Sequence, residues 1–206
     1  MKPSEIHSLL GQAKALREVS PAGIHTFALY WITWEAYRTR MLAVAARLRG
    51  WRIEDAYFAI GARRISSQRT YRICFKDITG VELAEQPGLL GRVWKLLDEI
   101  EVLRHRLIHG YRSASPVLIE QASRFLDSIL THQGRVFSDL PILPNDSISI
   151  SLGNVLAQRP GTGRGIAIKP DRQSLITDLK LEDRIPAKLP KDAILKRLAD
   201  VVTTLS

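Results

Sequence analysis

The chain has 206 residues, of which 45% are hydrophobic, and it carries a formal net charge of +9 at pH 7. This length predicts one domain, or one domain with an appendage, and the composition excludes a disordered or membrane-embedded chain. Because Cys74 is the single cysteine, an internal disulfide framework and a cysteine-based zinc site are also excluded. The basic balance favours anionic partners, with nucleic acid first among them.

The first residues do not show a secretory pattern. The most apolar window, residues 22–37, is too short and too often interrupted by polar side chains to span a bilayer. We therefore expect a cytoplasmic protein that does not contact a membrane.

Two helices are predicted at the start of the chain. Apolar side chains recur at three- and four-residue spacing over residues 4–19, which is typical of an amphipathic helix. Ser20 followed by Pro21 then predicts a second helix over residues 21–48, with a capping hydroxyl and proline at its first position. The aromatic side chains of residues 27–37 keep helical spacing, so we expect them to pack in the core rather than stack on nucleic-acid bases.

Glu35 is the exception within this aromatic run, because a carboxylate is costly there unless it is paired. Arg38, one turn later, is a local partner. A partner from another helix is equally open.

A short third helix is predicted for residues 53–60, and a basic run follows it. The run contains Arg63, Arg64, Arg69, Arg72 and Lys76, with Asp77 as its acidic member. Two interpretations stay open, a solvated helix face and a surface that contacts phosphates. Cys74 lies among apolar residues and is expected in the core. Gly80 and the pair Pro87 and Gly88 indicate loops before the next helix.

The next helix leads into the most charged stretch of the chain, residues 104–112. Apolar residues over positions 89–103 predict one buried helical face, and Gly110 predicts the end of that helix. Arg104, His105, Arg106 and His109 therefore lie in or beside its last turn. Cations at a helix C-terminus offset its dipole by about 0.3–1 kcal/mol each, which explains the charge without any function.

A further helix is predicted for residues 116–136, after Ser115 and Pro116. Residues 1–140 are then expected to form an all-α, up-and-down helical bundle. Residues 141–206 differ because prolines and glycines are frequent there. This appendage is expected to hold a small β-ribbon and one helix over residues 191–205. Residues 161–165 lack the ending of a phosphate-binding loop and are interpreted as a flexible turn.

The spacing of Arg104 and His109 resembles the Arg-x4-6-His motif of the HEPN superfamily of small all-α domains. His105 matches the polar position after the arginine, and Tyr111 extends the match to Arg-x4-His-x-Tyr, the form found in HEPN toxins paired with nucleotidyltransferase antitoxins. Glu35 is similar to an acidic position in the second helix of some members. The resemblance covers residues 1–140, and the appendage matches no family that we recognise.

The resemblance implies a metal-independent endoribonuclease without a cofactor, acting as a toxin or an anti-phage defence effector. His109 would move a proton, Arg104 would hold the scissile phosphate, and His105 would position the phosphate or orient His109. Arg106 and Arg112 would flank the cleft and hold RNA. The resemblance further implies a homodimer whose two motifs share one cleft.

In the toxin pairs that the sequence resembles, the tyrosine at the position of Tyr111 is a target of adenylylation by the antitoxin. A cognate nucleotidyltransferase is therefore a possible partner, although packing of Tyr111 on the last turn is the favoured interpretation. Two alternatives to the nuclease stay open. One is a non-catalytic HEPN domain that binds RNA or protein, and the other is a basic helical nucleic-acid-binding protein unrelated to HEPN.

Overall fold

The computed structural model describes residues 3–48, 56–57, 60, 65, 67–110, 114–137 and 140. Its helices are α1 (Pro3–Val19), α2 (Ile24–Leu48), α4 (Gln68–Thr79), the 3-10 helix η1 (Leu83–Glu85), α5 (Gly88–Ile108), α6 (Pro116–Thr131) and α7 (Gln133–Val136). The described part of the chain is all-α and has no strand, as predicted. Most of the predicted third helix and the whole appendage, with its predicted β-ribbon and final helix, lie outside the described residues.

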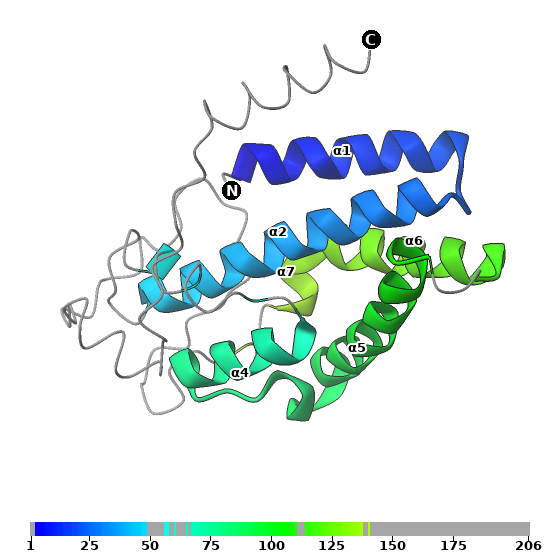
Figure 1. Cartoon of the computed structure of the whole chain (residues 1–206). Helices are drawn as coiled ribbons and strands as arrows, with labels where there is room; N and C mark the ends of the chain where they lie inside the picture. The colour runs from blue at the N-terminus through cyan, green and yellow to red at the C-terminus, as the bar shows by residue number, and fades with distance from the viewer. Residues whose placement is uncertain are drawn as a thin grey trace, which may run out of the picture.

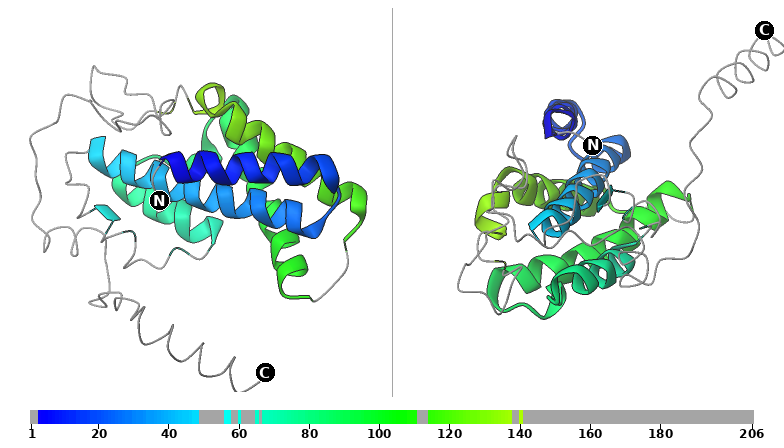
Figure 2. Two further views of the ribbon diagram at one scale, coloured as in Figure 1. Left: turned by 90° about the horizontal axis from the view of Figure 1, so that it is seen from above. Right: turned by 90° about the vertical axis from the view of Figure 1, so that its left-hand side faces the viewer.

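Helix α2 is the central element of the fold. It packs mainly against α1 and α6, and it also contacts α4 and α5. Figure 1 shows α1 lying along α2 in the opposite direction, with α4 and α5 on the far side of α2 from α1. The right-hand view of Figure 2 shows the same order nearly end-on, with α2 between α1 and the α4/α5 pair. The charged stretch at the end of α5 thus belongs to an outer helix.

The turn between α1 and α2 is built around the carbonyl oxygen of Ser20. This oxygen accepts hydrogen bonds from the Gly23 amide at 3.1 Å and from Thr26 Oγ1 at 2.7 Å. A Cβ atom on Gly23 would lie 2.5 Å from Ser20 Oγ and 3.1 Å from the Ser20 carbonyl oxygen, so this close turn favours glycine. Helix α2 therefore begins at Ile24 and not at Pro21, because the serine closes a turn instead of capping the helix at once.

The core is aromatic, and α2 supplies most of it. Its buried rings are those of Phe27, Tyr30, Trp31, Trp34 and Tyr37. Ring centroids of Trp34 and Trp94 are 5.5 Å apart, and those of Tyr37 and Phe137 are 5.7 Å apart, so α5 and the segment after α7 meet α2 through these rings. Cys74 is buried beside them in α4. The predictions of an aromatic core and a core cysteine are confirmed.

Helix α4 carries the described part of the basic run. Ser67 caps its start by accepting the Thr70 amide, and Gly80, with φ of 76°, ends it. Arg72 lies 3.1 Å from an Asp98 carboxylate oxygen, and Lys76 lies 3.7 Å from Glu82. Both side chains are thus paired with acidic residues of the same fold. Arg69 is exposed, and Arg63 and Arg64 lie outside the described residues.

Helices α5 and α6 differ from the prediction at two points. Leu89 and Leu96 were expected on the buried face of α5 but are 50% and 43% exposed. Helix α6 starts at Pro116, as predicted, but it stops at Thr131, and the short α7 follows after His132. No helix among the described residues is long and apolar enough to cross a membrane.

Candidate functional site

The C-terminal end of α5 places the predicted site residues. The helix ends at Ile108, the His109 amide donates to the His105 carbonyl at 3.2 Å, and Gly110 leaves the helix with φ of 68°. A left-handed residue at this position suits glycine, because it has no Cβ to clash with the carbonyl. The helix thus stops abruptly and leaves His109 at its last, exposed position.

His105 and His109 form a stacked pair of imidazoles. They are four residues apart on α5, so both lie on one face of the helix. Their ring centroids are 5.6 Å apart, their planes differ by 12°, and both side chains are exposed. Imidazole is the side chain best suited to exchange protons near neutral pH. The pair therefore presents two imidazole rings side by side to solvent.

Arg104 lies next to this pair but partly inside the protein. Its Nη1 atom is 3.5 Å from His105 Nδ1, at the long limit of a hydrogen bond. Its Nε atom is buried and has no hydrogen-bond partner among the described residues. The Nη1 end of the Arg104 guanidinium thus lies beside His105, while its Nε end faces the interior.

Glu101 precedes His105 by one turn on the same face of α5. Its Oε1 atom accepts the backbone amide of Gln68 at 2.8 Å, which joins the face to the start of α4. Burial raises the pKa of the Glu101 carboxyl, while the Gln68 amide and the positive charges of Arg38 and His105 act in the opposite direction. The Glu101 carboxyl is therefore near enough to His105 to interact with its charge.

Arg38 connects this face with Glu35 on α2. Its side chain is 2% exposed, donates to Gln68 Oε1, and lies 3.5 Å from Glu35 Oε1. Burial lowers the pKa of Arg38, and the positive charge of Arg104 lowers it as well. The negative charges of Glu35 and Glu101 act to raise it. The two guanidinium groups are thus close enough to repel each other.

Glu35 has the local partner that was expected, and a second one as well. Besides Arg38, it accepts the indole Nε1–H of Trp31 at 2.9 Å. A buried arginine beside Glu35 satisfies the carboxylate among the aromatic side chains. Glu35 is thus linked to Arg104 through the charge of Arg38, and no direct contact joins it to the histidine pair among the described contacts.

The remaining predicted site residues are placed as follows. Arg106 is exposed on α5, two residues from Arg104 and therefore on a different side of the helix. Tyr111 and Arg112 lie outside the described residues. The structure thus brings together Arg104, His105 and His109, and it places Arg106 on another side of the helix.

Two residues of this cluster were missed in the sequence, Glu101 and Gln68. Glu101 had a readable signal, because it precedes His105 by four residues on the same predicted helix. Gln68 had none, since it reaches the site through a contact between α4 and helices distant in the sequence.

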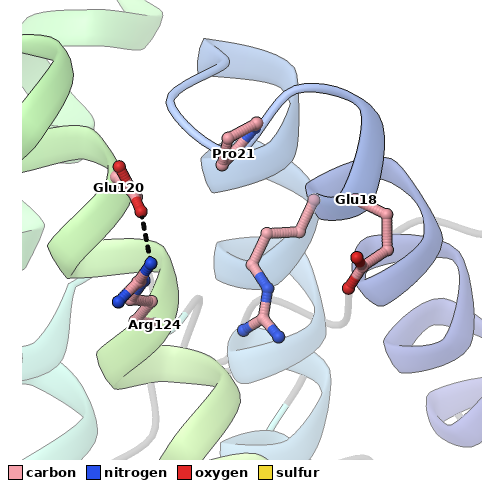
Figure 3. A pocket seen from close by; sticks show the side chains of 5 residues that line it. Glu18, Pro21, Glu120 and Arg124 are labelled. Carbon is pink, nitrogen blue, oxygen red and sulfur yellow. Dashed lines mark ion pairs between the residues drawn. The ribbon is translucent and has the colours of Figure 1, made fainter.

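A cavity of about 510 Å³ lies elsewhere, between the end of α1 and the first turns of α6. Figure 3 shows Glu120 and Arg124 paired along its wall, with Glu18 and Pro21 facing them. Arg17, which also lines the cavity, lies 2.6 Å from an Asp127 oxygen. Because two of its cations are already paired, this cavity offers less to an anion than the end of α5 does.

Among the described residues, no group of three or more histidine, cysteine and acidic side chains is placed to hold a metal ion. Comparison with known proteins identifies no relative, because no protein-family model, no curated protein and no solved structure matches the chain.

Proposed function

We propose that this chain is a metal-independent endoribonuclease of the HEPN type, with the end of α5 as its catalytic site. One observation carries the proposal. Two exposed imidazoles stack at the end of a helix, with an arginine Nη1 beside one of them. Proton carriers and a cation are the two tools that cleavage of RNA at its own 2′-hydroxyl requires.

In the proposed reaction, the 2′-oxygen attacks the adjacent phosphorus and the bond to the 5′-oxygen breaks. His109 takes the proton of the 2′-hydroxyl or supplies one to the leaving 5′-oxygen. Arg104 holds the non-bridging phosphate oxygens, which gain negative charge in the transition state. His105 orients His109 through the stacked rings. The products are a 2′,3′-cyclic phosphate and a 5′-hydroxyl, so atoms and charge balance without an oxidant or a metal.

The proposal includes the HEPN-like bundle and a homodimer in which the ends of two α5 helices face each other across RNA. Arg106 and Arg112 would bind phosphates at the edges of that cleft. The proposed setting is a toxin or an anti-phage effector, with a nucleotidyltransferase as antitoxin and Tyr111 as its possible target. The net positive charge of the chain supports RNA as the substrate.

The test is cleavage of RNA in excess EDTA by the wild-type protein and by His109→Ala. We expect the variant to lose about 10²–10⁴-fold in rate, the range that general acid–base catalysis supplies. His132→Ala is a matched control, because His132 is an exposed residue at the C-terminal cap of α6, as His109 is for α5. Equal rates for wild type and His109→Ala, or loss of cleavage on chelation, would overturn the mechanism.

A non-catalytic RNA- or protein-binding domain is the second candidate, and the burial of Arg104 Nε favours it. An arginine whose side chain is partly buried is less free to move with a phosphate group during the reaction. In that case Arg104→Ala would weaken RNA binding, and neither the wild-type protein nor the variant would cleave RNA. Filter binding and cleavage measured on the same preparation separate the two candidates.

A further inference from the structure

Helices α5 and α6 enclose an apolar groove that the charged site does not use. Its volume is about 390 Å³. The apolar residues that line it are Leu96, Ile100 and Leu103 from α5 and Leu118, Ala122 and Phe125 from α6. Leu103 and Ala122 are buried at its base, whereas Leu96 and Leu118 are 43% and 51% exposed at its mouth.

The same two helices carry other exposed apolar side chains. Leu89, Val102, Ile108 and Val117 are each at least 45% exposed. Single exposed apolar residues are normal, whereas apolar residues gathered in one groove indicate a surface that another element covers. In the described part of the chain, nothing fills this groove.

We propose that the groove is the docking site of this chain's own C-terminal segment, residues 191–205. The segment lies outside the described residues, and its sequence predicts an amphipathic helix. Ile194, Leu198, Val201 and Leu205 follow one another at four-, three- and four-residue spacing, which places them on one helical face. An apolar helix face in an apolar groove is a recurrent mode of recognition.

The dimensions agree with one short helix as the occupant. The groove runs from Leu96 to Leu103 and from Leu118 to Phe125, about two turns along each helix. This length matches the two helical turns from Ile194 to Val201 on the apolar face of the segment.

The connection between the described fold and the segment is long enough. The 50 residues 141–190 separate Leu140 from the segment. As a flexible chain they would span about 40 Å, whereas α5 is about 32 Å long, so the segment reaches any point of the groove. A tether of this kind gives an effective concentration of up to about a millimolar, which favours the chain's own segment over a second copy.

The charges at the border of the groove also fit. Glu99 is exposed on its α5 side. In a helix over residues 191–205, Arg197 lies at the border of the apolar face, because it precedes Val201 by one turn. With Lys191 and Lys196, the segment has three basic residues against two acidic ones. Docking therefore places a cation of the segment near the acidic side of the groove.

The test uses disulfide formation within the full chain, in a Cys74→Ala background that removes the native thiol. One variant carries Glu99→Cys with Arg197→Cys, and a second carries Gln121→Cys with Arg197→Cys, so either orientation of the segment is covered. The control carries Arg69→Cys, on the exposed side of α4, with Arg197→Cys. Non-reducing electrophoresis after mild oxidation, at several protein concentrations, distinguishes links within one chain from links between chains.

We expect one groove pair to form an intramolecular disulfide about tenfold faster than the control pair, at a rate independent of protein concentration. Adding Leu118→Asp at the exposed mouth of the groove should return the rate to that of the control. Equal rates for all three pairs would overturn the proposal, and so would disulfides that form only between chains, since these would assign the groove to a second copy. RNA cleavage does not enter this readout, so the docking proposal stands or fails separately from the nuclease.

Discussion

Arg38 shows how a buried cation supports an exposed site. It is 2% exposed, yet it contacts Gln68 on α4 and Glu35 on α2, and its charge interacts with Glu101 and Arg104 on α5. A buried charge of this kind is stable only while its partners remain. The cluster therefore joins α2, α4 and α5 through Arg38, Gln68 and Glu101.

Replacing Arg38 with methionine should destabilise the fold. The change keeps most of the side-chain volume but leaves Gln68 Oε1 without its donor and leaves Glu35 with only the Trp31 indole, at an expected cost of about 2 kcal/mol. Arg69→Met, an exposed substitution in α4, should change the free energy of unfolding by about 0.5 kcal/mol or less. Urea denaturation measures both. Equal effects of the two substitutions would show that the Arg38 contacts contribute nothing to stability.

Glu101 should make stability depend on pH. Burial raises its pKa above the ordinary 4.5, so the folded protein keeps the Glu101 proton at pH values where the unfolded chain has lost it. Ionisation of Glu101 therefore costs stability above the folded pKa, and this cost disappears as the pH falls toward 4.5. Glu101→Gln keeps an acceptor for the Gln68 amide and removes the ionisation.

The free energy of unfolding of Glu101→Gln relative to wild type should thus be highest at pH 7 and should decrease on acidification. Urea midpoints measured for both proteins from pH 7 to pH 4 provide the check. A difference that stays constant, or that grows as the pH falls, would contradict the raised pKa of Glu101.

Part of the site was predictable because it is local. Arg104, His105 and His109 belong to one helix end, so their spacing alone predicted that they lie together. The stacking of the imidazoles and the buried Nε of Arg104 were not predictable, since rotamers and burial depend on neighbours from α2 and α4. Gln68 entered the site only through tertiary contacts.

At the level of the helices, glycine has opposite roles at two positions. Gly110 has φ of 68°, whereas Gly11 lies inside α1, and a Cβ atom at either position would meet nothing within 4 Å. Gly110→Ala should therefore cost about 1 kcal/mol of stability through backbone strain alone. Gly11→Ala should add about 0.5–1 kcal/mol, because alanine is the better helix former. Thermal unfolding measures the stability of both variants. If Gly11→Ala also destabilised the protein, Gly11 would not be an ordinary helix-interior glycine.

Helix boundaries were predictable where one strong local signal acts. Gly110 ended α5 and Pro116 began α6 as expected. The start of α2 was wrong by three residues, because Ser20 uses its backbone carbonyl to close a turn. The exposure of Leu96 was missed for another reason. Helical spacing identifies an apolar face, but it does not tell whether the described fold covers that face.

For the whole molecule, the structure separates the scaffold from the site. Helix α2 holds the aromatic core, and the charged end of α5 lies on an outer helix. This arrangement leaves the histidine pair exposed. The all-α class was predictable from periodicity, whereas the central position of α2 became visible only through its contacts with four other helices.

The central claim is that Arg104 and His109 of two copies act at one site, and mixed dimers test it most directly. One chain is wild type, its partner carries Arg104→Ala and His109→Ala, and separate affinity tags on the two chains allow the mixed dimer to be purified. RNA cleavage in EDTA is compared with that of a wild-type dimer bearing the same tags. A shared site predicts that the rate falls by about tenfold or more, because half of its proton carriers and cations are gone. A mixed dimer that keeps about half of the wild-type rate would contradict the account, since each chain would then act alone.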